Sequence, residues 1–249
     1  MKEFLLSHYD ERQTPTDMLV LHATAHQGIE AVQCLDNLKL SAHYVLTVEG
    51  ELLKLVDEQN RAWHAGVGYW RGVDADLNSH SIGIEICSPS LGQEPFPDIQ
   101  IEKLIPFCQK LIRKYKIAPQ NIVGHSDIAP QRKPDPGMAF PWKRLAKEGI
   151  GLWYQPKNAA KMAETDIATL LSIIGYDTRS EDAVKASAYA FCRHFAPQYV
   201  TVDVDVYHLV ENILPARFDF MREEKFLQIL KAVAYSYQNL SQSSRPCKI

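Results

Sequence analysis

The segment 123–137 constrains this chain more than any other stretch, because it holds three prolines, at positions 130, 134 and 136. Proline fixes its own backbone and interrupts a helix, so these residues predict a stiff loop. The loop follows a short apolar run, 121–123, that indicates a strand. It carries an imidazole, an ammonium group and a carboxylate, on His125, Lys133 and Asp135. Because a metal site benefits from ligands that are held in place before the ion arrives, the segment predicts a preorganised site.

Two other predicted strands carry polar side chains that could join this loop. The apolar run 18–24 contains His22, and the alternating run 81–88 contains Glu85. Three isoleucines of the second run share one face, so Glu85 lies on the other. A carboxylate in the middle of a strand is costly unless it is paired or reaches solvent in a cleft. Each residue taken singly also has an ordinary explanation: a strand-end histidine, an exposed ion-pair partner, and, for Asp135, a turn residue beside prolines.

Strands and helices alternate through the first 153 residues, which predicts an α/β domain. The hydrophobic periodicity distinguishes the two kinds of element. A predicted hairpin turns at Glu49-Gly50, and Asp98 can cap a helix with one apolar face. A proline-containing loop, 89–97, could border the site. The predicted strands are 18–24, 43–48, 51–56, 81–88 and 121–123, and the predicted helices are 28–38 and 98–115.

The chain changes character after residue 153. Residues 154–162 read as a linker, and the remainder has helical periodicity without a convincing strand. Helices are predicted at 163–175, 181–195, 203–214 and 218–240. We therefore expect a domain at 1–153, a small all-helical domain at 163–217, and a helical extension at 218–249 to which the sequence assigns no task.

Charge and cysteine content exclude several classes of protein. Lys and Arg number 27 against 30 Asp and Glu, giving a net charge of −3 without a basic cluster, so nucleic acid is not an expected partner. The five cysteines form no Cys-x-x-Cys pair, which argues against a disulfide framework and against a four-cysteine zinc site. Cys34, Cys87 and Cys108 lie in apolar patterns and are expected to be buried thiols.

The N-terminus predicts the compartment only weakly. Its first apolar run is three residues long, too short for a signal peptide, and no later window predicts a membrane helix. The sequence as written therefore predicts a cytoplasmic protein. A periplasmic or cell-envelope location is the alternative, if a signal peptide was removed.

An ordered series of motifs between residues 18 and 153 resembles the type-2 N-acetylmuramoyl-L-alanine amidases. These AmpD/AmiD-like zinc amidases are related to the peptidoglycan recognition proteins. The resemblance implies a mixed central sheet flanked by helices. After it, the first three C-terminal helices resemble a peptidoglycan-binding module. Besides the segments around His22, Glu85 and His125, the motifs are Ser-Ala-His-Tyr at 41–44, Trp-His-Ala-Gly at 63–66, Phe-Pro-Trp at 140–142 and Gly-Ile-Gly-Leu-Trp at 149–153.

The resemblance also implies a role for each candidate residue. Catalytic zinc takes three protein ligands and leaves one position open for water. The family's ligand positions fall on His22, His125 and Asp135, its general base on Glu85, and its oxyanion-stabilising cation on Lys133. His26 is expected to be a loop residue rather than a ligand, and His43 a core histidine or a support for the site. The candidate substrate-binding residues are His64, Asn78 and Arg71.

Together these features predict zinc-dependent hydrolysis of the amide between N-acetylmuramic acid and L-alanine, with peptidoglycan or muropeptides as substrate. The alternative is a non-catalytic peptidoglycan-recognition protein, in which a zinc ligand is characteristically replaced; here all three positions are filled. A structural zinc protein would need a fourth ligand, and none is evident. Serine catalysis lacks its parts, since the chain has neither Gly-x-Ser-x-Gly nor Ser-x-x-Lys.

Overall fold

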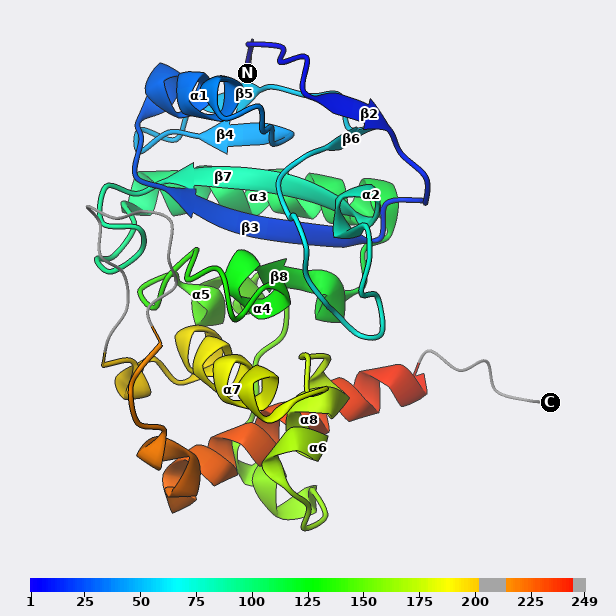
Figure 1. The fold of residues 1–249 in the computed structure, drawn as a ribbon, viewed down its shortest axis with the longest axis vertical. Coiled ribbons are helices and arrows are strands. Elements are labelled where there is room, and N and C mark those ends of the chain that lie inside the picture. The colour runs from blue at the N-terminus through cyan, green and yellow to red at the C-terminus, as the bar shows by residue number, and fades with distance from the viewer. Residues whose placement is uncertain (202–213, 244–249) are drawn as a thin grey trace, which may run out of the picture.

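A six-stranded mixed sheet organises the N-terminal part of the chain in this computed structural model, which describes residues 1–201 and 214–243 (Figure 1). The strand order is β1-β5-β4-β7-β3-β8. Within this sheet β4 and β5 pair antiparallel, and the other neighbouring strands pair parallel. In that order the strands are Lys2–Glu3, Leu52–Lys54, Tyr44–Leu46, Ser81–Cys87, Met18–Thr24 and Ile122–Gly124.

The register of the three central strands brings distant polar residues to one edge of the sheet. His22 on β3 lies opposite Glu85 on β7. On its other side β3 pairs with β8, where Leu21 faces Gly124, the residue before His125. Because parallel strands end at the same edge, residues about 60 and 100 positions away from His22 meet there.

Each face of the sheet is covered by a different set of helices. Helix α3 (Asp98–Tyr115) packs on the isoleucine face of β7 and on alternate residues of β3. The opposite face is covered by helix α1 (Gly28–Asn37), which packs on β4 and β5. On this same face, Val20 and Val123 belong to the hydrophobic core of the C-terminal helices. His22 follows Val20 at the strand period, so the polar edge and the C-terminal helices share that face.

The C-terminal helices form one layer below the sheet in Figure 1, and we call them the helical layer. Polar caps define their starts: Asp166 accepts from the Thr169 N–H before α6, and Ser180 from the Ala183 N–H before α7. The core of this layer is continuous with the sheet. Its elements are the 3-10 helix η2 (Pro156–Lys161), α6 (Ile167–Ile174), α7 (Glu181–Phe195), η3 (Pro197–Tyr199), η4 (Asp219–Arg222) and α8 (Glu224–Ser243).

A buried carboxylate also ties the helical layer to the sheet. Asp127 lies in the short helix α4 (His125–Ile128) and accepts hydrogen bonds from the Gly124 N–H (2.8 Å) and from the hydroxyl of Tyr176 (2.6 Å). Nδ1 of His194, on α7, lies 2.8 Å from the same carboxylate. The His194 ring stacks on Trp142 with centroids 3.9 Å apart. Since buried polar groups need partners, this network fixes how α7 sits against α4.

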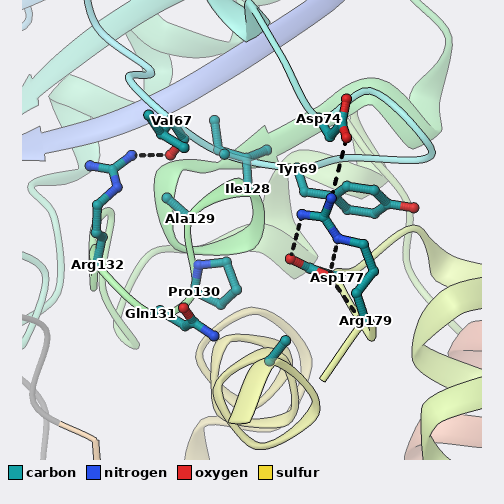
Figure 2. A pocket seen from close by; sticks show the side chains of 12 residues that line it. Val67, Tyr69, Asp74, Ile128, Ala129, Pro130, Gln131, Arg132, Asp177 and Arg179 are labelled. Carbon is teal, nitrogen blue, oxygen red and sulfur yellow. Dashed lines mark hydrogen bonds and ion pairs between the residues drawn. The ribbon is translucent and has the colours of Figure 1, made fainter. Parts of the chain in front are cut away.

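A pocket of about 240 Å³ lies where the α4 loop meets the helical layer (Figure 2). The Arg179 guanidinium stacks over the Tyr69 ring at 4.7 Å and pairs with Asp74 (3.2 Å) and Asp177 (2.9 Å). Residues of the α/β part and of the helical layer therefore meet here as well.

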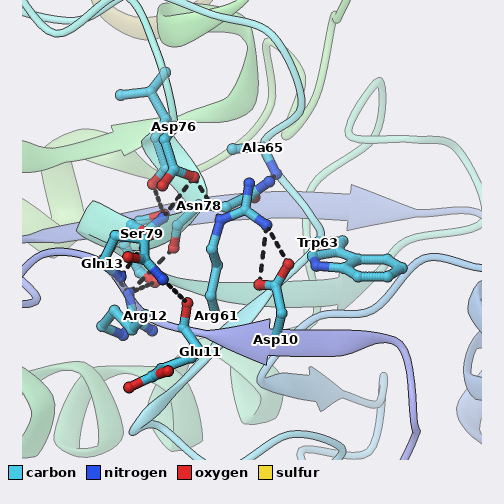
Figure 3. A network of polar contacts seen from close by, with 12 residues as sticks. Asp10, Glu11, Arg12, Gln13, Arg61, Trp63, Ala65, Asp76, Asn78 and Ser79 are labelled. Carbon is cyan, nitrogen blue, oxygen red and sulfur yellow. Dashed lines mark hydrogen bonds and ion pairs between the residues drawn. The ribbon is translucent and has the colours of Figure 1, made fainter.

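The N-terminal segment is fastened by Arg12, within the polar network of Figure 3. Its guanidinium donates to the carbonyls of Asn78 (3.1 Å), Ser81 (3.1 Å) and Asn60 (2.7 Å). These carbonyls belong to helix α2 (Leu77–His80), to the start of β7 and to strand β6 (Asn60–Ala62). Strand β2 (Tyr9–Glu11) pairs with β6 antiparallel.

The α/β fold with a mixed sheet is confirmed, and three predicted elements match their bounds: 18–24, 98–115 and 181–195. The hairpin is present but shorter than predicted. The predicted loop begins with the four-residue helix α4. This helix is possible because it ends at Ile128, before the first proline of the loop, Pro130. Short elements such as α2 and α5 (Trp142–Lys147) span too few residues to show a period. Most of the predicted helix 203–214 lies outside the described residues. No helix among those residues is long and apolar enough to cross a lipid bilayer.

Candidate metal centre and cleft

Three predicted ligands meet at the edge of the sheet. Nδ1 of His22 lies 2.9 Å from Nδ1 of His125 and 3.4 Å from Oδ2 of Asp135. The His125 and Asp135 atoms are 3.2 Å apart. All three residues are buried, and one ligand atom from each lies within 4.8 Å of the others. Two imidazoles and one carboxylate at this spacing form a donor set that suits a divalent metal.

Backbone contacts explain why these side chains converge. His22 comes near the end of β3, and His125 begins α4 directly after β8. The Ser126 N–H donates to the Asp135 carbonyl at 2.7 Å, which closes the loop between the two ligands. Gly92, at φ +73°, packs so tightly on the Pro136 carbonyl that a side chain there would collide with it. The 89–97 loop thus lies directly against the ligand loop, as the sequence suggested.

Burial and charge set the protonation of the ligands. Burial and the neighbouring His125 lower the pKa of His22 to about 4, so this imidazole is neutral near pH 7. Burial by itself would raise the pKa of Asp135, but the hydrogen bonds of His125 and His22, and the charge of these rings when protonated, hold the Asp135 pKa well below its usual value. A neutral imidazole and an ionised carboxylate are the forms that bind metals.

Glu85 lies beside the ligands. Its Oε1 is 3.9 Å from Nδ1 of His22, and its side chain is 13% exposed. Burial, with the charge of Asp135 adding to it, raises the pKa of Glu85 to about 8, against the opposing effect of Lys133. A carboxyl group that exchanges a proton near neutral pH is suited to general acid–base chemistry.

A cleft of about 450 Å³ opens in front of these groups. Glu85, Lys133, His125 and Asp135 line its polar end. Helix α1 supplies an apolar side. The other lining residues include Ala31, Cys34, Leu35, Leu38, Leu40, Trp63, His64 and Leu91. A cleft with one apolar wall and a few convergent polar groups is the usual form of a small-molecule site.

Residues 12–138 match the protein-family model described as N-acetylmuramoyl-L-alanine amidase (Amidase_2). The match covers just over half of the 249 residues and contains every predicted ligand. The chain belongs to this family. It is therefore an N-acetylmuramoyl-L-alanine amidase, of the class that hydrolyses the bond between N-acetylmuramic acid and L-alanine in muropeptides.

Individual relatives extend this assignment beyond the α/β part. The amidase AmiD of Escherichia coli (strain K12) is 36% identical over 215 residues, covering 76% of this chain and 78% of AmiD. The 1,6-anhydro-N-acetylmuramyl-L-alanine amidase AmpD of Enterobacter cloacae is 45% identical over 109 residues, but the match covers only 44% of this chain and 57% of AmpD. The AmiD match is therefore too long to be confined to the α/β part.

Two solved structures are also similar to this chain beyond its α/β part. Escherichia coli AmiD, in complex with anhydro-N-acetylmuramic acid-L-Ala-D-γ-Glu-L-Lys, superposes with a TM-score of 0.71 at 30% identity and covers 92% of this chain and 93% of its own. AmpDh3 from Pseudomonas aeruginosa, in complex with anhydromuramic pentapeptide, gives a TM-score of 0.70 at 30% identity, covering 91% and 93%. Both alignments are long enough to include the helical layer of the present amidase.

The predicted substrate-binding residues of the amidase are not all in the cleft. His64 lines it, and it also lies behind His22, with its Nδ1 3.0 Å from Nε2 of His22. Asn78 accepts hydrogen bonds from the N–H groups of His64 (3.0 Å) and Ala65 (2.7 Å) and is not a lining residue. Arg71 donates to the Ile174 carbonyl at the end of α6 (2.8 Å), away from the cleft. Substrate contacts by these three residues stay predictions.

Other histidines and cysteines take clear positions. His26 lies in the loop before α1 and lines the cleft without joining the ligand cluster, as expected. His43 is a core histidine, whose Nδ1 accepts from the Gly83 N–H at 3.0 Å. Cys87 and Cys108 are buried as predicted. Cys34 is only half-buried, because it faces the cleft.

Sequence reasoning missed the apolar side of the cleft. Leu38 and Leu40 are 62% and 43% exposed, although both are large and apolar. Both residues follow the last turn of α1, where an apolar residue is readily taken for part of the buried face of the helix. The signal in the sequence was that these leucines lie outside the periodic apolar face, which indicates an exposed apolar surface.

Proposed function

We propose that this amidase holds one zinc ion between His22, His125 and Asp135. The observation that carries the proposal is the meeting of a neutral imidazole, a second imidazole and an ionised carboxylate at the polar end of a cleft, with Glu85 beside them. Two nitrogens and one oxygen are common ligands of catalytic zinc, which leaves a further position open. When bound, zinc supplies a Lewis acid that activates water at neutral pH.

Glu85 is the proposed general base. Its carboxylate accepts a proton from the attacking water and then donates it to the nitrogen of the departing L-alanine. Burial raises the proton affinity of Glu85 in the metal-free chain above that of an exposed glutamate, which suits a group that takes up a proton and returns it. The cleft position places the carboxylate where substrate would lie.

Lys133 is the proposed cation that stabilises negative charge on the scissile carbonyl oxygen. It lines the same cleft, two residues before Asp135. As water attacks the scissile carbonyl, negative charge grows on its oxygen, and an ammonium group stabilises that charge more in the transition state than in the bound substrate. Lys133 should therefore contribute to kcat more than to binding.

We propose a muramoyl peptide as the occupant of the cleft. Support comes from the two relatives whose structures hold anhydromuramoyl peptides. The apolar side formed by Leu35, Leu38 and Leu40 suits methyl groups, such as those of the lactyl ether and of L-alanine. Of the three predicted polar contacts of the peptide stem, His64 lines this cleft, whereas the hydrogen bonds of Asn78 and Arg71 are made outside it.

A wall-binding role for the helical region 163–217 belongs to the same proposal. An opening of about 590 Å³ lies between this region and the extension that follows it, lined by Glu181 and Val184 of the region and by Met221 and Arg222 of the extension. Alanine at Glu181 and Arg222 together should weaken sedimentation with insoluble peptidoglycan and leave the rate on small muropeptides unchanged. Unchanged sedimentation would remove this role.

The enzymatic proposal is tested by mass spectrometry of defined muropeptides incubated with zinc-loaded and chelator-treated protein. We expect separation of the muramoyl group from the intact peptide only with zinc, and recovery of activity when zinc is returned. Equal cleavage by the fully chelated protein, with its metal content measured, would overturn the metal assignment. Cleavage elsewhere in the peptide would overturn the assigned bond.

A further inference from the structure

A chain of three buried polar groups runs from the metal centre into the sheet. Nε2 of His22 lies 3.0 Å from Nδ1 of His64. Nε2 of His64 lies 3.3 Å from the hydroxyl of Ser81, and that hydroxyl donates to the Leu77 carbonyl at 2.6 Å. His22, His64 and Ser81 are 1%, 8% and 0% exposed, so water has little access to these groups.

The direction of these hydrogen bonds follows from the Ser81 end of the series. A carbonyl can only accept, so the Ser81 hydroxyl gives its proton to Leu77. The Ser81 oxygen is then left to accept, and Nε2 of His64 must be the protonated nitrogen. The His64 ring is buried beside the rings of His22 and His43, where a positive charge would be costly, so the ring is neutral and Nδ1 carries a lone pair. That lone pair accepts the Nε2–H of His22.

The consequence reaches the metal centre. A neutral imidazole has one protonated nitrogen, and in His22 the hydrogen bond to His64 makes it Nε2. Nδ1 is therefore the nitrogen with a free lone pair, and it is the atom that faces His125 and Asp135. We propose that His64 and Ser81 are positioning residues that hold His22 in its metal-binding tautomer; this inference rests on the proposed zinc site.

The surroundings of His64 are shaped to keep its ring in place. Asn78 accepts the backbone N–H of His64 at 3.0 Å. Gly83 lies flat against the ring, since a Cβ on this residue would stand 2.5 Å from the His64 Cγ. The ring of His43 meets that of His64 edge to face at 5.6 Å. A residue whose backbone is anchored and whose ring is packed in this way is suited to fixing the orientation of a ligand, and loss of such a support typically costs 10- to 100-fold in metal affinity or activity.

Ser81→Ala is the test variant, with Ser79→Ala as its matched control. Both serines are fully buried and two residues apart, but the Ser79 hydroxyl accepts a hydrogen bond from the Gln13 N–H, whereas the Ser81 hydroxyl bonds to His64. In full-length protein we expect Ser81→Ala to weaken zinc binding about 10-fold in chelator competition and to lower kcat with little change in KM. Ser79→Ala should keep the wild-type zinc affinity at a similar melting temperature.

Nitrogen NMR of the histidine rings gives a readout that a merely structural role would not move. In metal-free wild type, His22 should be protonated on Nε2, and His64→Leu should populate the other tautomer. His64→Asn, whose amide oxygen can accept the same hydrogen bond, should restore the wild-type state in part. The wild-type spectrum is decisive even where a His64 variant fails to fold. Protonation of His22 on Nδ1 in wild type, or equal zinc affinity in the two serine variants, would overturn the inference. Absence of zinc binding by wild type with His22 protonated on Nε2 would instead overturn the proposed function.

Discussion

The metal centre and the Asp127 network lie on the same face of the sheet but use buried polar groups in opposite ways. Asp127 has three partners, the Gly124 N–H, the Tyr176 hydroxyl and the His194 ring. Glu85, one strand from His22, shares its surroundings with a second carboxylate, and burial raises its pKa to about 8. A buried carboxylate whose oxygens accept several hydrogen bonds stabilises the fold. A buried carboxylate with fewer partners has a shifted pKa and is suited to take part in a reaction.

The comparison indicates that the metal centre is less optimised for stability than the Asp127 network. Functional sites often keep groups that a stable core would exclude. Changes at the cleft should therefore alter catalysis with little loss of stability, and changes at the Asp127 network should do the reverse. The predictions below test that difference.

Asp135→Ala should have the largest effect. It removes the only anionic ligand of the cluster, so zinc binding and amidase activity should both be lost while the protein stays folded. Metal analysis after gel filtration, with circular dichroism as the folding control, checks both points. Full zinc occupancy in this variant would exclude Asp135 as a ligand.

Glu85→Gln should keep zinc but lower kcat by about 10²–10⁴. The amide has nearly the size of the carboxylate yet cannot accept a proton. Steady-state kinetics on a soluble muropeptide and metal analysis of the same sample provide the measurement. Turnover close to wild type would mean that a group other than Glu85 acts as the base.

Lys133→Ala should reduce kcat by about 10²–10³ and change KM much less, because the ammonium group acts on charge that develops in the transition state. Lys133→Arg keeps the charge and serves as the control. A rise in KM at constant kcat would show instead that Lys133 binds the substrate uniformly.

Tyr176→Phe tests the other side of the comparison. Loss of the hydroxyl leaves one oxygen of Asp127 without its donor, which should lower the free energy of unfolding by about 1–3 kcal/mol. We expect unchanged kcat and zinc affinity at temperatures where the variant is folded. Chemical denaturation and kinetics on one preparation measure both quantities. A large loss of kcat without loss of stability would contradict the division made above.

The smallest expected effect is on the metal-free protein, whose free energy of unfolding should depend on pH through Glu85. Glu85 has a pKa of about 8 in the folded chain, above that of an unfolded glutamate. The folded state therefore keeps a proton that the unfolded state releases, and this contribution to stability is lost as pH rises from about 4.5 through 8.

Glu85→Gln carries no such charge at any pH. In excess chelator it should equal wild type near pH 4.5 and become increasingly more stable than wild type as the pH rises to 8. Denaturation curves of both proteins across this range provide the check. Parallel stability curves would show that the buried carboxyl carries no such penalty.

Local pattern predicted the elements that are long enough to show a period. The apolar alternation of Ser81–Cys87 placed Glu85 opposite the isoleucine core, and the helix Asp98–Tyr115 was predicted with its bounds. Short elements such as α4 were missed, because four residues carry no period. The ligand residues were named through the resemblance, since single histidines and aspartates have many ordinary uses.

The sequence by itself determined the longer strands and helices, the proline-containing ligand loop and the residue types available for zinc chemistry. Only the tertiary structure decided that Leu21 pairs with Gly124 and His22 with Glu85, which brings the ligands together. It also placed His64 behind His22 and Arg71 against α6. The physical reason is that side-chain periodicity along one strand or helix selects a face, whereas strand order and long-range packing select what that face meets.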